Sequence, residues 1–311
     1  MNENGPVLVV GAAGLDVKGR PSGKLVAGTS NAGGIRSTVG GVARNIAENL
    51  ARLDVETQLL TAVGQDTNGE NLLGQAAASG IDVSEVLITS THHTGAYVAI
   101  LDEKGHLEVA IDDMDILADI TPRYLNDRRR LFRDARMLVV DANLTPDTLE
   151  TAIRLANQYD LPVCADPTST SLALRLCDHL GNLYMVAPNV GEANALCGVE
   201  IASEDRDKAI NAAKHLVSTG VKIAIVTLAE FGVVYADSEI SGHIPAIQTE
   251  VVDLTGAGDA LTAGVIFGLL NDIPLDECVR LGVTLASLAL RSRETVRSDL
   301  TDEMLYDELV I

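Results

Sequence analysis

The sequence predicts an α/β protein built around a mostly parallel sheet. Apolar runs of strand length alternate with segments of helical periodicity, as in successive βαβ units. Aromatic residues make up only 3% of the chain, so the core must consist of Ala, Val, Ile and Leu, as in buried parallel sheets. After a first strand at 7–10, strands are expected at 57–63, 96–101, 107–111, 137–141, 161–165, 183–187, 222–227 and 232–235. Helices are expected at 42–53, 69–79, 146–158, 205–218, 258–270 and 275–290.

Two segments interrupt this alternation. Residues 12–38 are rich in Gly, Ser and Thr, contain Pro21 and have no helical period. A stretch of this length is too long for an ordinary connection, so it is either a flexible insertion or a small sheet over a site. Residues 92–115 contain a hairpin-like pair around 102–105 and are the second candidate for the same small sheet. Residues 1–311 are therefore interpreted as one domain with two inserted segments.

Charge and cysteine content narrow the function classes. The formal net charge of −21 argues against nucleic acids and anionic membranes as partners, because both are polyanions. The cysteines form no C-x-x-C pair, which favours free thiols in a reducing compartment. The N-terminus lacks the basic region of a signal peptide, and no apolar run approaches membrane-spanning length. These features predict a cytoplasmic protein.

The segment 250–270 carries the main chemical signal. A strand-like run leads into Gly256-Ala257-Gly258, and a long apolar helix follows. Small residues allow backbone N–H groups to approach a ligand, and the helix N-terminus adds partial positive charge, so this is an anion site. Asp259 lies in the first helical turn. It is either a helix cap or a base that accepts a proton from a hydroxyl nucleophile.

A second motif lies at Gly40-Gly41-Val42-Ala43-Arg44-Asn45. The two glycines allow close contact with a ligand, and Asn45 falls one turn into the helix that follows. Alone, this pattern is equally typical of a glycine-rich helix start with a solvated Asn.

Together, the two motifs resemble the paired signatures of the PfkB, or ribokinase-like, carbohydrate kinases, and the resemblance covers almost the whole chain. It implies a three-layer α/β/α fold with a mostly parallel central sheet and a small β lid from about 12–38 and 92–115. It also implies an ATP-dependent kinase in which Asp259 is the catalytic base and the N–H groups of Gly256, Ala257 and Gly258 stabilise the transferring phosphoryl group. The residues implied to hold the hydroxyls of the acceptor are Asp16, Gly40, Gly41 and Asn45.

The same resemblance implies which residues bind the nucleotide. Asn189 and Glu192 match an element that organises Mg²⁺ and phosphates, with Glu192 acting through metal-bound water. The turn from Thr227 to Gly232 resembles a nucleotide-binding turn, with Ala229 where Gly is usual, and Asp54 likewise replaces a common Gly. Thr255, Gly256 and Gly258 are implied to contact the nucleotide, and Asp253 with Thr255 is a candidate potassium site.

The acceptor is suggested by shorter segments. Residues 28–31, 40–53, 110–114, 141–144 and 166–169 look like the pseudouridine kinase branch, which implies transfer to the 5′-hydroxyl of a ribosyl nucleoside. No Lys follows Asp166-Pro167-Thr168-Ser169, where many members of that branch carry one. Ribokinase or another nucleoside or sugar kinase activity stays open. The polar residues expected to contact the acceptor are Thr29, Ser30, Asn31, Thr94, Tyr97, Asn143, Asp166 and Thr168.

The sequence disfavours three other classes of protein. Gly11-Ala12-Ala13-Gly14 after the first strand is half of a dinucleotide fingerprint, but the full motif and its helix are absent, which disfavours an oxidoreductase. Residues 19–25 have the wrong spacing for a P-loop. A non-catalytic nucleoside-binding relative is disfavoured by the intact Asp259 loop. Finally, lids of this family often pair between subunits, so the resemblance implies a homodimer through the lid.

Overall fold

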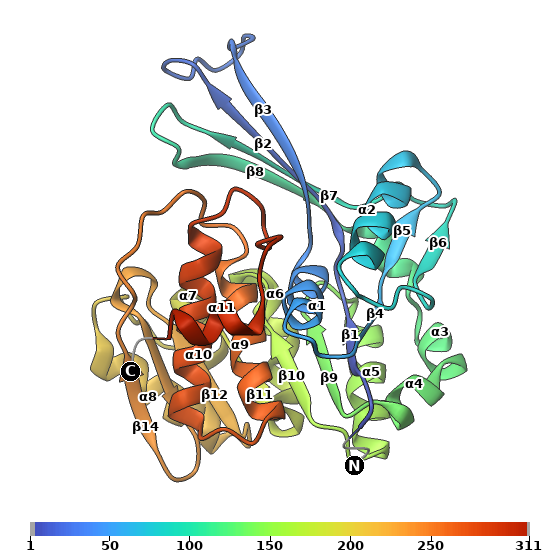
Figure 1. The fold of residues 1–311 in the computed structure, drawn as a ribbon, viewed down its shortest axis with the longest axis vertical. Helices are drawn as coiled ribbons and strands as arrows, with labels where there is room; N and C mark the ends of the chain where they lie inside the picture. The colour runs from blue at the N-terminus through green and yellow to red at the C-terminus, as the bar shows by residue number, and fades with distance from the viewer. Residues whose placement is uncertain (1–3, 310–311) are drawn as a thin grey trace.

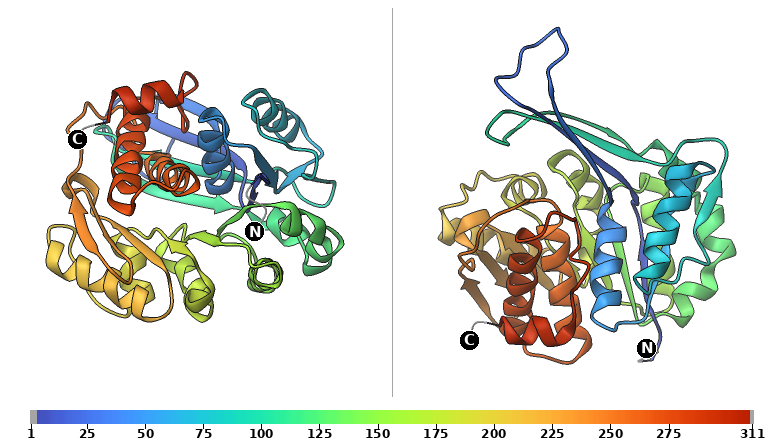
Figure 2. Two further views of the ribbon diagram at one scale, coloured as in Figure 1. Left: turned by 60° about the horizontal axis from the view of Figure 1, so that its bottom comes forward. Right: turned by 45° about the horizontal axis from the view of Figure 1, so that its top comes forward.

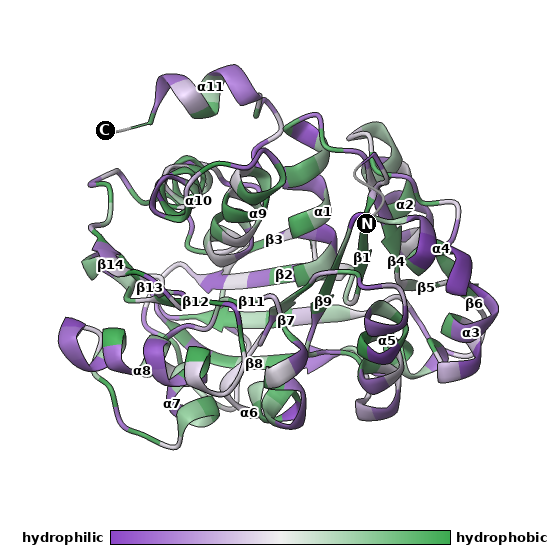
Figure 3. Cartoon of the chain, turned by 90° about the horizontal axis from the view of Figure 1, so that it is seen from below, coloured by the Kyte–Doolittle hydropathy of each residue, from purple (hydrophilic) through white to green (hydrophobic). Residues whose placement is uncertain are grey.

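A computed structural model describes residues 4–309 and shows an eight-stranded central sheet between two layers of helices (Figures 1 and 3). Neighbouring strands from β4 to β12 are parallel, whereas β13 and β14 are antiparallel additions at one edge. The predicted three-layer α/β/α fold is therefore confirmed. In spatial order the strands are β14 (Ser241–Ile244), β13 (Val233–Ala236), β12 (Ile223–Thr227), β11 (Met185–Val186), β10 (Val163–Asp166), β9 (Met137–Asp141), β1 (Val7–Val10) and β4 (Thr57–Leu60).

The strands are buried on both faces, and alternate residues supply two separate cores. Val7 and Val9 pack on one side, whereas Leu8 and Val10 pack on the other, as the two-residue period of a strand requires. The first side is covered by α1 (Val42–Arg52), α9 (Ala257–Leu270), α10 (Leu275–Leu290) and α11 (Asp302–Asp307). The second side is covered by α3 (Pro122–Asp127), α4 (Arg129–Asp134), α5 (Pro146–Gln158), α6 (Thr170–Ala173), α7 (Val190–Cys197) and α8 (Arg206–Ser218).

The two interrupting segments form one small sheet, the lid sheet, which projects from the body (Figures 1 and 2). It joins two hairpins that are distant in sequence, because β2 pairs antiparallel with β3 and parallel with β7. Of the two possibilities for residues 12–38, the structure thus shows the sheet. The strands of the lid sheet, in order, are β3 (Gly33–Gly40), β2 (Gly14–Pro21), β7 (Ala96–Leu101) and β8 (Leu107–Asp113).

A second small sheet connects the lid to the body and was not expected from the sequence. Its strands, β5 (Ala62–Gly64) and β6 (Leu87–Thr89), are parallel and flank helix α2 (Thr67–Ala78). In the described part of the chain there are also three 3₁₀ helices: Asp115–Asp119, Leu174–Asn182 and Ala229–Phe231. Within residues 4–309, no helix combines the length and apolar character that crossing a membrane requires.

Close packing of α9 against α10 fixes the position of the anion loop. Helix α9 is apolar on all sides and buried from Ala260 to Gly268. At Gly264 a Cβ atom would lie 2.8 Å from the Cα atom of Gly282 and 2.9 Å from the carbonyl oxygen of Leu281. The two backbones are therefore too close for any side chain at Gly264, and α10 holds α9 in one place.

Replacing Gly264 with Ala should destabilise the protein by about 1–3 kcal/mol, because the added methyl group must displace the backbone of α10. The free energy of unfolding in urea measures this effect. The matched control is Gly74→Ala in α2, where no atom lies within 4 Å of the added group. That change should leave stability unchanged or raise it by about 0.5–1 kcal/mol. Equal stability of Gly264→Ala and the wild type would contradict the close packing.

Candidate active site

The loop before α9 forms an anion site from backbone groups. Gly256 precedes the helix with a φ of 82°, in the left-handed region that favours glycine, and a side chain there would overlap the carbonyl oxygen of Thr295. The N–H groups of the first turn have no partner within a helix, so Ala257 and Gly258 offer donors at the positive end of α9. No atom lies within 4 Å of a Cβ position at Gly258, which leaves space for an anion.

Asp259, in the first turn of α9, meets Asn45 of α1. The Nδ2 atom of Asn45 donates to Oδ2 of Asp259 at 2.7 Å, although the two residues are 214 positions apart. Asn45 is buried, and α1 and α9 pack against each other. The structure therefore brings the two glycine-containing sequence motifs to one point.

The Asp259 carboxyl holds its proton more tightly than an ordinary aspartic acid. Burial raises its pKa most; the Asn45 hydrogen bond lowers it, and the charges of Asp16 and Asp141 raise it further, to about 7. A carboxylate with a pKa near neutrality is a stronger base than usual and is still ionised at slightly alkaline pH. Asp259 is thus suited to accept a proton from a hydroxyl group.

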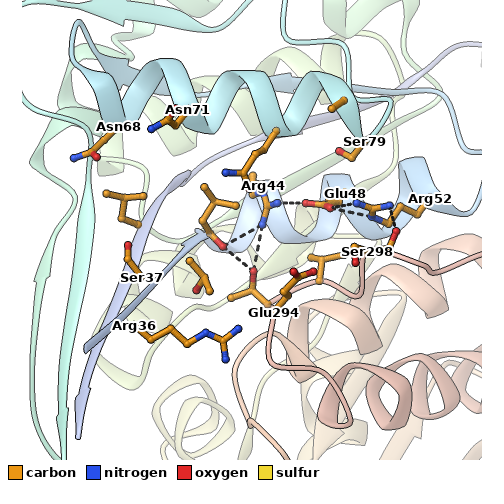
Figure 4. A pocket seen from close by; sticks show the side chains of 17 residues that line it. Arg36, Ser37, Arg44, Glu48, Arg52, Asn68, Asn71, Ser79, Glu294 and Ser298 are labelled. Atoms are coloured by element: carbon orange, nitrogen blue, oxygen red, sulfur yellow. Dashed lines mark hydrogen bonds and ion pairs between the residues drawn. The ribbon is translucent and has the colours of Figure 1, made fainter. Parts of the chain in front are cut away.

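Arg44 determines the orientation of the Asn45 amide. Its Nη1 donates to Oδ1 of Asn45 at 3.0 Å, so the Nδ2 end of the amide must face Asp259. Arg44 is in turn held by a buried ion pair with Glu48, one turn later in α1, and by the hydroxyl of Thr295. These side chains line a polar cavity of about 580 Å³ between α1, α2 and the loop after α10 (Figure 4).

Asp16 enters the site from the lid strand β2. It is 8% exposed, and burial raises its pKa to about 6 although two nearby cationic side chains oppose this shift. A side chain at Gly40 would overlap the Asp16 carboxylate, so the glycine and the acid are in direct contact. Tyr97 is the register neighbour of Asp16 on β7. Gly41, the residue before α1, completes this wall with a φ of 95°.

Asn143 and Asp166 lie at the floor, where β9 and β10 end. The Asn143 amide donates to Asp141 at 3.0 Å and to the Thr168 hydroxyl at 3.4 Å. Asp141 was not predicted from the sequence. It is fully buried and accepts hydrogen bonds from the N–H groups of Ala12 at 2.7 Å and Ala43 at 3.0 Å. This one carboxylate thus links β1, α1 and β9. The sequence feature that could have identified Asp141 is an acidic residue at the end of an otherwise apolar strand.

The residues predicted for the nucleotide side lie around the N-terminus of α7. Asn189 and Glu192 form a reciprocal cap, because each side chain accepts from the backbone N–H of the other, at 3.0 and 2.8 Å. The N–H of Thr227 donates to the carbonyl of Pro188 at 3.0 Å, which places the end of β12 beside this cap. The turn then closes at Gly232, whose carbonyl accepts from Leu228 at 2.7 Å.

The Asp166 carboxyl is close enough to Asp259 and Glu192 for their charges to act on it. Burial raises the pKa of Asp166 well above its ordinary value, and the charges of Asp259 and Glu192 raise it further. Among residues 4–309, no group of three acidic, His or Cys side chains already forms a metal cage. Mg²⁺ prefers oxygen ligands and keeps several of its waters, so the separate carboxylates of Asp166 and Glu192 would fit it as groups that hold those waters.

Four predicted acceptor contacts are not brought to this site. Thr29, Ser30 and Asn31 lie at the exposed tip of the lid sheet, and the Asn31 amide bonds the backbone of Val26 at 2.9 Å in both directions. Thr94 is buried, and its hydroxyl binds Asp66 at 2.7 Å. Within one chain, these polar groups serve the turn at the lid tip and the start of α2.

The candidate potassium site is contacted by Lys18 of the lid. Its Nζ lies 2.6 and 2.8 Å from the carboxylate oxygens of Asp253 and also bonds the Thr255 hydroxyl. This lysine was not among the residues predicted from the sequence, because nothing in the sequence pairs it with a loop 235 positions away.

A base beside an anion-binding loop is what transfer of a phosphoryl group to a hydroxyl requires, which defines the class as a phosphotransferase with an alcohol acceptor. Residues 6–302 match the model of the pfkB family carbohydrate kinases, and the chain belongs to this family. Kinases of this family use ATP, normally with Mg²⁺.

The chain is also similar to individual kinases. The chain is 35% identical to a pseudouridine kinase of Escherichia coli (strain K12), over 97% of this chain and 95% of the relative. It is 28% identical to a guanosine-inosine kinase of Exiguobacterium acetylicum, over 96% and 98% of the two chains. Among solved structures, Arabidopsis thaliana ribokinase complexed with ribose and ATP superimposes with a TM-score of 0.85 over 99% of both chains, at 22% identity.

Replacing Asn45 with Ala should raise the pKa of Asp259, because the amide hydrogen bond stabilises the ionised carboxylate. Less of the base is then ionised at a given pH. The acidic limb of the pH profile of kcat/KM should move to higher pH by about one unit, the size of a hydrogen bond to a charged group. As control, Asn49→Ala removes an amide that binds only the carbonyl of residue 45, and the limb should stay in place. An unmoved limb in Asn45→Ala would contradict the role of this contact.

Proposed function

We propose that the protein transfers the γ-phosphoryl group of ATP to the 5′-hydroxyl of pseudouridine, which yields pseudouridine 5′-phosphate and ADP. The observation that carries the chemistry is the 2.7 Å hydrogen bond between Asn45 and Asp259 at the N-terminus of α9. The acceptor is supported by the similarity to the Escherichia coli pseudouridine kinase and by 26% identity to a pseudouridine kinase of Arabidopsis thaliana over 93% of this chain and 91% of that relative. Similarity to the guanosine-inosine kinase favours another nucleoside as the second candidate acceptor.

The acceptor would lie between the lid sheet and α1. Asp16 and Asn45 offer an acid and an amide to ribose hydroxyls, and Gly40 and Gly41 allow the sugar to approach the backbone. Tyr97 closes the lid side, and the amide of Asn143, which is held by Asp141, lies at the floor. This placement points the 5′-hydroxyl at Asp259.

Asp259 then acts as general base. The 5′-oxygen forms a bond to the γ-phosphorus as the bond from that phosphorus to the bridging oxygen of ADP breaks, and the proton of the hydroxyl passes to the carboxylate. The N–H groups of Gly256, Ala257 and Gly258 stabilise the negative charge on the transferring group. No covalent enzyme intermediate is needed. With a pKa of about 7, Asp259 is mostly ionised above neutral pH and ready to accept the proton.

The nucleotide would lie along the C-terminal edge of the sheet. Thr255 of the anion loop, Asn189 and the turn from Thr227 to Gly232 border this region. Mg²⁺, when bound, supplies positive charge to the phosphate oxygens, and Asp166 and Glu192 would hold it through water. Burial now raises the pKa of both carboxyls, and a nearby cation would favour their ionised forms.

The lid sheet would also join two copies of the chain. Its β2, β3, β7 and β8 residues alternate between the faces, and the face opposite Asp16 is apolar. On that face Ile35 is 82%, Val109 54% and Ile111 68% exposed. An apolar sheet face of this kind is a candidate interface, and in a two-fold dimer the same face of both copies would meet. Free cysteines throughout are consistent with a reducing, cytoplasmic setting.

A panel of acceptors tests the proposed substrate. Pseudouridine, uridine, guanosine, inosine, adenosine, ribose and fructose are each incubated with MgATP, and ADP release is followed. The expected result is the highest kcat/KM with pseudouridine, because a relative that is 35% identical over 97% of this chain carries that name. A higher kcat/KM with ribose or with guanosine would replace pseudouridine as the acceptor but keep the kinase chemistry.

Asp259→Asn serves as the catalytic control for the panel. The amide cannot accept the proton, so turnover should fall by about 10²–10⁴-fold while acceptor binding persists. The variant should also be more stable than the wild type at pH 8, since it lacks a carboxyl whose folded-state pKa lies above its unfolded value. This gain in Tm should shrink as pH falls toward 5. Near wild-type kcat would remove Asp259 from the mechanism.

Replacing Ile111 with Asp should separate the dimer, because a charge at the centre of an apolar interface is not paired. Multi-angle light scattering should show a dimer for the wild type and a monomer for the variant. The control is Val26→Asp, an exposed apolar residue at the tip of the lid, outside the paired strands. A monomeric wild type would refute the dimer.

A further inference from the structure

The ammonium group of Lys18 is bound to the chain that leads into the anion loop. Nζ contacts both carboxylate oxygens of Asp253, at 2.6 and 2.8 Å, and the hydroxyl of Thr255. The same carboxylate accepts a hydrogen bond from the N–H of Thr255 at 2.9 Å. Lys18 and Asp253 are about one-fifth exposed, so bulk water only partly screens the pair. Thr255 immediately precedes Gly256, and these contacts therefore hold the first residue of the loop.

The surroundings leave no place for a second cation. The remaining space beside this ion pair is a cavity of about 10 Å³, roughly the room of one water molecule. Arg36 and Arg293 also line it, together with Asp16. The local charges are thus three cationic and two anionic side chains, and a free monovalent cation would meet a net positive surrounding. Burial alone would raise the pKa of Asp253, but the hydrogen bonds from Lys18 and Thr255 lower it below its ordinary value.

We propose that Lys18 is a positioning residue that supplies, from within the chain, the positive charge at Asp253 and Thr255, so that this kinase works without a free monovalent cation. The ammonium neutralises a carboxylate that would otherwise repel an incoming triphosphate. It also orients Thr255 and through it the N–H groups that follow. The proposal rests on the kinase activity of the family and not on the identity of the acceptor.

Because Lys18 belongs to the lid, it couples the anion loop to the position of the lid, which a free ion would not do. Lys18 is on β2, two residues beyond Asp16, and its side chain lies on the same face of the lid sheet. The charge reaches Asp253 only when the lid is close to the body. The anion loop is therefore completed by the same strand that contacts the acceptor.

The test compares wild type with Lys18→Met in buffers where tetramethylammonium chloride is replaced by potassium chloride at constant ionic strength. Calorimetry measures the affinity for the magnesium complex of a non-hydrolysable ATP analogue, without any acceptor. The wild-type affinity should not change with potassium. Lys18→Met should bind about tenfold more weakly, the size of a lost hydrogen-bonded charge, and potassium should restore most of the affinity.

Turnover with the best acceptor of the panel gives a second readout, and failure of pseudouridine as acceptor leaves the binding experiment intact. Lys24→Met removes an exposed lysine of the same lid and should behave as wild type. Lys18→Gln keeps a hydrogen-bonding group without charge, so it should show the same potassium rescue if Lys18→Met does not fold. Activation of the wild type by potassium would overturn the proposal, and so would a defect in both Lys18 variants that potassium does not restore.

Discussion

The hydrogen bond between Asn45 and Asp259 joins α1, which follows the first lid hairpin, to α9, which begins at the anion loop. Its geometry depends on groups on both sides. Arg44, paired with Glu48, orients the amide, and the close packing of α9 on α10 holds the carboxyl. The central sheet, by contrast, places both helices on one face and leaves their N-termini at the same edge. The contact is small, but it is the point at which the proposed acceptor site and the proposed phosphate loop meet.

The same contact lies in an excess of negative charge. Asp16 and Asp259 have pKa values of about 6 and about 7, and Asp166 is shifted in the same direction. Because these folded-state values exceed the unfolded value of 3.8, the carboxyls progressively reduce stability as pH rises from about 4 to 7. These carboxylates reduce the stability of the fold, but they favour binding of a polyanion that brings a metal ion with it. The loss of stability is therefore a cost of the chemistry proposed for this site.

The layers of the fold could be predicted from the sequence, because apolar runs such as 137–141 and periodic segments such as 275–290 need no distant partner to be recognised. The lid bounds, 14–40 and 96–113, also lie within a few residues of those expected. The residues whose roles the sequence analysis missed depend on contact partners that sequence spacing does not reveal. Thr94 is a polar residue in a loop, and only its contact with Asp66 shows that it is structural. Asp141 and Lys18 act through residues more than 90 positions away. Ala229 and Asp54, with φ of 51° and 58°, keep a glycine-like backbone where the family usually has Gly.

The parallel pairing of β2 with β7 makes the lid a single flap. Each hairpin has its own turn, yet hydrogen bonds between their inner strands, from Leu15 to Gly19 and from Ala96 to Ile100, prevent one from swinging without the other. The four points at which the lid strands join the body therefore have to bend together. With the proposed function, one movement of the lid would admit the acceptor and release its phosphorylated form. An acceptor too bulky to fit beneath the lid would then keep both hairpins away from the body.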